Sequence, residues 1–82
     1  MDNNMFESIC KDIVYKHMLD KYYEIKKEDI FIVWICKILG NNKALVSVEG
    51  AYGLYFEITY NGKTDEFYID VYEKKEGCVE YW

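Results

Sequence analysis

The only histidine of the chain, His17, is the residue best suited to acid or base chemistry near neutral pH. Nucleophilic catalysis also requires a Ser or Cys that such a base can activate, and no elbow motif with either residue lies beside His17 in the sequence. Residues placed at 100° steps put His17 on the apolar arc of a predicted helix, where histidines usually pack in the core. We therefore expect a protein that is not an enzyme and has no catalytic residue.

Three cysteines, Cys10, Cys36 and Cys78, have wide spacings that match neither a zinc motif nor a disulfide framework. Cys10 and Cys36 fall inside apolar segments, where a thiol acts as a small hydrophobe. The glycines form no phosphate-binding pattern. We expect no metal, no other cofactor and a reducing compartment, the cytoplasm.

Two alternating segments, LYFEITY and KTDEFYIDVY, flank Asn61-Gly62, which is the favoured sequence for a two-residue hairpin turn. A turn of that length fixes which residues of the two strands face each other. It predicts four facing pairs: Phe56 with Phe67 and Leu54 with Ile69 on the core side, and Tyr55 with Tyr68 and Glu57 with Glu66 on the other side.

The side away from the core is the predicted partner-binding site, formed by Tyr55, Glu57, Glu66, Tyr68, Asp70 and Tyr72. Tyrosine supplies a large contact area at low entropic cost and is enriched in interfaces. The alternative is that these tyrosines form cross-strand pairs that only stabilise the hairpin. Facing carboxylates repel, so Glu57 and Glu66 would hold a cation, share a proton or await a basic residue. At an exposed hairpin tip, however, water screens the repulsion and no function follows.

A helix and a sheet must position these residues. Asn3 or Asn4 would cap a helix over about residues 4–22, whose apolar arc includes Phe6, Ile13 and His17. Strands are predicted over about residues 30–39, 43–49, 53–60 and 63–73. The expected fold is α+β, with the N-terminal helix packed on a four-stranded antiparallel meander in one domain over residues 1–82.

The segment IFIVWICKIL is apolar on both of its faces, so it suits a central or doubly covered strand. If Ile32, Trp34, Cys36 and Ile38 face the helix, then Phe31, Val33, Ile35 and Lys37 share the outer face with the tyrosines. A sheet face this apolar requires cover from a second subunit, a partner or the tail residues Val79, Tyr81 and Trp82.

Charge argues against direct binding to nucleic acid. The chain of 82 residues has a net charge of −5 and contains no Arg, and residues 41–82 hold eight acids but only four lysines. Phosphate contacts are made mainly by Arg and Lys, so an acidic sheet favours solubility or a basic protein partner. The longest apolar run, Ile30 to Cys36, is too short to cross a membrane, and the N-terminus lacks the pattern of a signal peptide.

The segments IFIVWICKILGNNKALVS, GLYFEITYNG and EFYIDVYEK resemble an uncharacterised family of small proteins from bacteriophages and prophages of low-GC Gram-positive bacteria. The resemblance extends from about Asp29 to Lys75 and brings no catalytic residue. It implies a phage accessory protein in the host cytoplasm.

We therefore expect a protein that binds and modulates a host protein, such as a component of a defence nuclease complex. One alternative is an oligomer that binds a small ligand or nucleotide signal, in which Lys37, Lys43 or Lys63 converges with tyrosines. A second alternative is a structural dimerisation module, that is, a homodimer.

Overall fold

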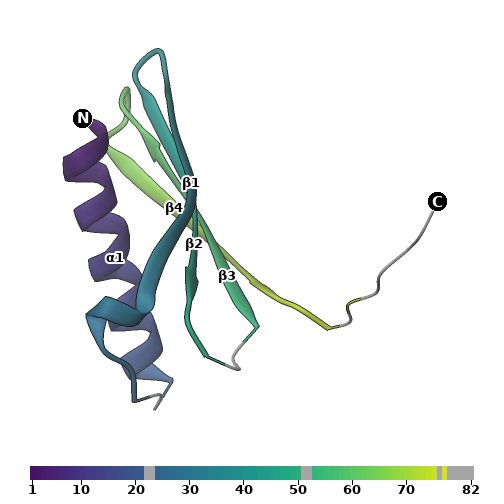
Figure 1. Cartoon of the computed structure of the whole chain (residues 1–82). Helices are drawn as coiled ribbons and strands as arrows, with labels where there is room; N and C mark the ends of the chain where they lie inside the picture. The colour runs from purple at the N-terminus through teal and green to yellow at the C-terminus, as the bar shows by residue number, and fades with distance from the viewer. Residues whose placement is uncertain (22–23, 51–52, 76, 78–82) are drawn as a thin grey trace.

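The computed structural model describes residues 1–21, 24–50, 53–75 and 77. The elements are α1 (Asn3–Asp20), the short 3-10 helix η1 (Lys27–Asp29), β1 (Ile30–Ile38), β2 (Asn41–Val48), β3 (Leu54–Asn61) and β4 (Glu66–Glu73). The four strands form one antiparallel sheet in the order β1-β2-β3-β4, with α1 against one face (Figure 1). The predicted α+β fold is confirmed.

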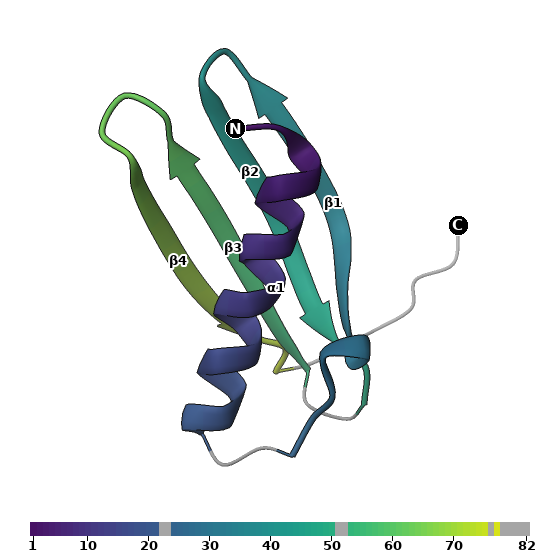
Figure 2. The ribbon, with the colours of Figure 1, turned by 90° about the vertical axis from the view of Figure 1, so that its left-hand side faces the viewer.

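Helix α1 is capped by Asp2, whose carboxylate accepts a hydrogen bond from the backbone N–H of Met5 at 2.8 Å. The predicted caps, Asn3 and Asn4, instead lie in the first turn of the helix. Four residues at intervals of four form the buried stripe of α1: Phe6, Cys10, Val14 and Met18. The helix lies across β1 and β2 more than across the rest of the sheet (Figure 2).

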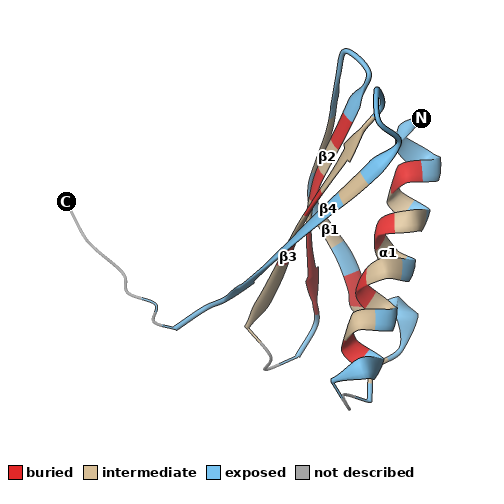
Figure 3. Cartoon of the chain, turned by 180° about the vertical axis from the view of Figure 1, so that it is seen from behind, coloured by how far each residue is buried: buried red, intermediate tan, exposed pale blue. Residues whose placement is uncertain are grey.

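We call the sheet face against α1 the inner face and the opposite face the outer face. The core lies between α1 and the inner face, where the buried residues of helix and sheet meet (Figure 3). The sheet contributes Ile30, Ala44, Val46, Val48, Phe56 and Ile58 to this core. Ala44, Val46 and Val48 alternate along β2, and all three are buried in this core.

Strand β1 contains an irregularity that the sequence did not reveal. Its register against β2 shifts between Ile32 and Trp34, so the extra residue is Val33. Before the shift Ile32 lies opposite the buried Val46, whereas after it Ile35 lies opposite the buried Ala44. An extra residue in one strand inverts the faces of all residues beyond it.

The assignment of β1 residues to the two faces was therefore wrong beyond Val33. Ile32 faces the helix as expected, and Phe31 lies on the outer face, opposite Ser47. The residues exchanged by the bulge are Trp34, Cys36 and Ile38, which lie on the outer face, and Ile35 and Lys37, which lie on the inner face.

The hairpin of β3 and β4 also differs from the prediction. Asn61 faces Glu66, so the loop comprises the four residues 62–65 and not the two residues Asn61 and Gly62. Asp65 adopts a positive φ of 56°, and its backbone N–H donates to the carbonyl of Asn61 at 2.9 Å. The Asp65 carboxylate accepts a further bond from the Tyr60 hydroxyl at 2.6 Å. These contacts close a longer loop than an Asn-Gly turn requires.

The four predicted facing pairs are consequently wrong. The structure pairs Tyr55 with Tyr72, Phe56 with Val71, Glu57 with Asp70, Ile58 with Ile69, Thr59 with Tyr68 and Tyr60 with Phe67. Because the displacement is an even number of residues, every side chain of β4 remains on its predicted face.

Candidate functional site

The outer face is the part of the sheet on which the predicted partner-binding residues lie. Tyr55, Glu57, Glu66, Tyr68, Asp70 and Tyr72 all belong to it, because their strand positions alternate with those of the inner-face residues. Among the described residues, no helix or strand covers this face (Figures 1 and 3). In the described part of the chain, the sheet is thus a single layer with one covered and one open side.

The tyrosines occupy the β3 and β4 half of the outer face. Tyr55 and Tyr72 are direct cross-strand neighbours, whereas Tyr68 lies further along β4, opposite Thr59. Tyr68 is 48% exposed and Tyr72 is 52% exposed, while Tyr55 is partly buried. Two tyrosine rings are therefore accessible to a partner, and the third supports one of them from the neighbouring strand.

The carboxylates are arranged differently from the prediction. Glu57 faces Asp70, and Glu66 lies at the end of the strand opposite Asn61. Lys43 of β2 forms an ion pair with Glu57, with 3.0 Å between Nζ and Oε1. The hydrogen bond to Glu57, followed by the charge of Glu57, raises the pKa of Lys43 above its ordinary value. Lys43 therefore offsets the repulsion that two facing carboxylates would otherwise cause.

A cation site at Glu57 and Glu66 is not formed, because these residues do not face each other. Within the described ranges, no group of three or more His, Cys, Asp or Glu side chains is placed to hold a metal ion.

Apart from Asn41, Lys43 and Ser47, the β1 and β2 half of the outer face is apolar. Its residues include Phe31 and Trp34, each 41% exposed, together with Cys36, Ile38 and Leu45. Sequence reasoning missed Trp34, Cys36 and Ile38, because a segment that is apolar at nearly every position has no alternation to reveal a bulge. The tyrosines and this apolar region form one continuous surface over the sheet.

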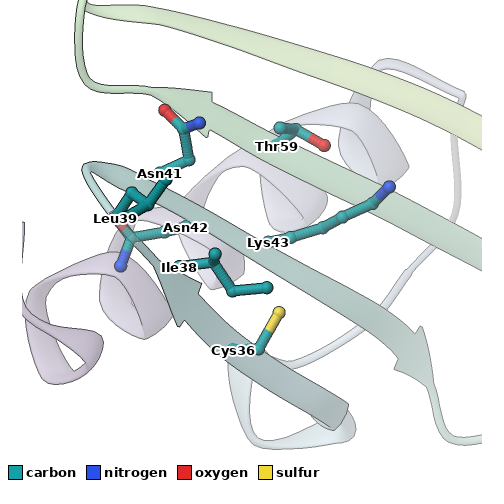
Figure 4. Close-up of a pocket in the computed structure, with 7 residues that line it drawn as sticks. All are labelled: Cys36, Ile38, Leu39, Asn41, Asn42, Lys43 and Thr59. Atoms are coloured by element: carbon teal, nitrogen blue, oxygen red, sulfur yellow. The ribbon is translucent and has the colours of Figure 1, made fainter.

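A hollow of about 310 Å³ lies where β1 ends and β2 begins, lined by Cys36, Ile38, Leu39, Asn41, Asn42, Lys43 and Thr59 (Figure 4). Leu39 is 93% exposed and has a positive φ of 59°, a conformation that bulky residues rarely adopt. Lys43 extends across the hollow toward β3 (Figure 4).

The lysines proposed for a small ligand do not converge. Lys43 lies on the outer face, while Lys37 is paired with the buried Asn42 and lies on the inner face. Lys63 belongs to the loop between β3 and β4 and lines a different hollow, together with Met1 and Tyr60.

His17 and Cys10 lie on the helix side of the sheet. The His17 ring meets Phe56 edge-on with 5.2 Å between ring centroids, so it packs on the inner face. Burial, followed by the nearby charge of Glu7, raises the pKa of the Cys10 thiol to about 12. A thiol with so high a pKa is a weak nucleophile at neutral pH.

The tail residues predicted as a cover, Val79, Tyr81 and Trp82, lie outside the described residues. None of the helices in the described ranges has the length and apolar character needed to cross a membrane.

Comparison with protein families shows that residues 6–80 match a family of unknown function, DUF6275. No curated protein and no solved structure matches the chain. The match includes most of α1 and all four strands, so the outer face lies within the part of the chain that matches the family.

Proposed function

This chain belongs to the DUF6275 family, and we propose that it is a non-enzymatic accessory protein that binds a basic protein partner through its outer face. The observation that carries the proposal is the combination of exposed aromatic residues and carboxylates on a sheet face that no described element covers. Exposed apolar patches rimmed by polar groups commonly mark interaction sites.

Tyr68 and Tyr72 are the anchors of this surface. Both rings are about half exposed, so a partner can bury them further. Truncation of a buried aromatic anchor commonly costs about 2 kcal/mol or more in binding, equivalent to roughly thirtyfold in affinity. The loss of a cross-strand contact costs only about 0.2–1 kcal/mol in fold stability.

The charge of the outer face favours a basic partner over a second copy. Glu57, Glu66 and Asp70 carry three negative charges there, whereas Lys43 supplies one positive charge and already pairs with Glu57. Two copies meeting through their outer faces would bring like charges together, which is costly at an interface. A homodimer through this face is therefore the weaker proposal.

The biological setting we propose is a phage-encoded protein in the host cytoplasm, with a host protein such as a defence nuclease component as its target. Its support is the resemblance of residues 29–75 to small phage and prophage proteins.

The test is capture of proteins from extract of the natural host by tagged protein, with quantitative mass spectrometry of the bound fraction. The first variant combines Tyr68→Ala and Tyr72→Ala. The matched control combines Met5→Ala and Leu19→Ala, two residues of α1 with similar exposure, 57% and 48%. We expect a protein enriched by the parent and by the control, and lost with the tyrosine variant. Equal enrichment by all three proteins would contradict the proposal.

A further inference from the structure

The two edges of the sheet are not equivalent. Edge strand β1 is interrupted by the bulge at Val33, a device that blocks pairing with another chain. Edge strand β4 pairs with β3 along all eight residues, Glu66–Glu73, without a register shift. It contains no Pro and no Lys. No strand in the described part of the chain pairs with the other edge of β4, which therefore presents a regular row of backbone donors and acceptors.

The inner face of β4 is only partly covered by α1. Phe67 stacks on Phe6, with ring centroids 6.4 Å apart, so the two elements touch at the start of β4. From there β4 diverges from α1 (Figures 1 and 3). Ile69 and Val71 are consequently 42% and 44% exposed although they face the helix side.

A wedge-shaped hollow of about 340 Å³ separates the end of α1 from β4. Its apolar walls are Ile13, Ile69 and Val71, and Lys16, His17 and Asp20 complete the lining. Its volume suits one or two aliphatic side chains, which would cover the exposed residues of β4 as α1 covers β1 and β2.

We propose that the basic partner binds by adding a strand to the free edge of β4, with aliphatic side chains in the wedge and basic side chains on the outer face. Alternate residues of an added strand point to opposite faces, so one side would contact Ile69 and Val71. The other side would lie beside Tyr68 and Asp70. This inference rests on the proposed function and specifies how its partner docks.

The charge of β4 indicates which kind of strand can add to its edge. Glu66 and Asp70 give the outer side of this strand two negative charges and no positive charge. A second copy of β4 would bring the same carboxylates to the same edge, where like charges disfavour pairing. An extended segment that alternates basic and aliphatic residues complements both sides.

The probe is an acetylated and amidated peptide of eight residues that alternates Lys with Val. Binding is followed by NMR chemical shifts and amide hydrogen exchange of the full chain. We expect shifts and slowed exchange in β4 from Tyr68 to Tyr72, and no change in β1. The same peptide with Glu in place of Lys should bind at least tenfold more weakly. A peptide methylated on every Lys and Val backbone nitrogen should not bind, because it cannot donate to the edge.

Two variants of the protein distinguish binding at the β4 edge from binding at the β1 edge. Ile69→Lys places a cation in the wedge and should weaken binding of the Lys-Val peptide at least tenfold. Val33→Lys, at a residue of β1 with 45% exposure, should leave it unchanged. Amide spectra of both variants report whether the fold is retained. Absence of binding to the parent, or perturbation of β1 in place of β4, would overturn the inference.

Other occupants of the edge give distinguishable results. A chain ending at Gly77 that binds the peptide at least tenfold more tightly than the full chain would assign the edge to the protein's own tail. A dimer in light scattering that Ile69→Lys converts to a monomer would assign it to a second copy. Either result overturns the inference. If host-extract capture survives Ile69→Lys but not Tyr68→Ala with Tyr72→Ala, strand addition is wrong while the proposed function stands.

Discussion

Gly62 lies directly against the backbone carbonyl of Gly40, so a Cβ atom at residue 62 would overlap that carbonyl. The backbone N–H of Gly62 also donates to Oδ1 of Asn41 at 3.1 Å. The loop between β3 and β4 is thereby attached to the turn between β1 and β2. This contact helps to fix the position of β4, the strand that carries Tyr68 and Tyr72.

Substitution of Gly62 should therefore destabilise the fold. Gly62→Ala places a methyl group on the Gly40 carbonyl, and such overpacking commonly costs about 1–3 kcal/mol. The matched control is Gly40→Ala, because a Cβ at Gly40 meets nothing within 4 Å. Urea denaturation should show a clear loss for Gly62→Ala and a much smaller one for Gly40→Ala. Equal losses would contradict the close approach. A two-residue Asn-Gly turn would instead require a positive φ at Gly62, and φ of Gly62 is not positive.

Replacement of Leu39 should relieve backbone strain. Leu39 has a φ of 59° and its side chain is almost fully exposed, so it gains little burial in return. Leu39→Gly removes the Cβ that opposes this conformation and should stabilise the fold by up to about 1 kcal/mol. Leu39→Ala retains the Cβ and should leave the midpoint of thermal unfolding nearly unchanged. A gain shared by both variants would place its origin in the side chain and not in the backbone.

Stability should fall at alkaline pH through Cys10. Its pKa is raised from 9.0 to about 12 in the folded protein, so between these values the unfolded state loses the proton first. The contribution of the Cys10 thiol to the free energy of unfolding is therefore fully present below pH 9 and is lost as pH rises toward 12. Cys10→Ala should reduce this slope in urea denaturation from pH 8 to pH 11.

Part of the decrease in the free energy of unfolding with pH should remain in the Cys10→Ala variant. The hydrogen bond to Asp65 raises the pKa of Tyr60, which gives the same sign of pH dependence. An identical slope in parent and variant would show that Cys10 ionises as easily in the folded as in the unfolded state.

Charge on the outer face should govern how fast the partner associates. Glu66→Gln with Asp70→Asn removes two carboxylates that face solvent and should slow association mainly at low salt, where steering by charge is least screened. The control is Glu7→Gln, on α1, which leaves the outer face unaltered. Association rates at about 20 and 200 mM salt would be compared once the captured protein is purified. A salt dependence unaffected by the double variant would argue against a basic partner.

The order of the helix and the four strands could be predicted from the sequence, because helical and strand periodicities differ and Gly and Asn mark the turns, whereas the short helix η1 was not predicted. The assignment of β4 side chains to faces was also correct, since an error of an even number of residues preserves it. The exact pairs could not be predicted. They depend on Asp65 adopting a positive φ, and Asn61-Gly62 is a stronger local signal for a shorter turn.

Only the β3 and β4 half of the outer face could be predicted from the sequence. Val33 forms a bulge in a segment where apolar residues occupy both faces. No change of residue type therefore marks the exchange of the two faces beyond Val33. The placement of Trp34 and Ile38 on the outer face, and the ion pair of Lys43 with Glu57, follow from three-dimensional contacts between strands. These features could not be predicted from the sequence alone.

Site-specific photo-crosslinking in the cells that naturally produce the protein would show whether the outer face contacts a partner protein. A benzoylphenylalanine residue would replace Tyr72 on the outer face or, as the control, Leu19 on α1, at similar exposures of 52% and 48%. Binding through the outer face should give a discrete protein adduct from position 72 and none from position 19, with the adducted protein identified by mass spectrometry. An adduct from position 19 without one from position 72 would place the partner on α1 and rule out binding through the outer face.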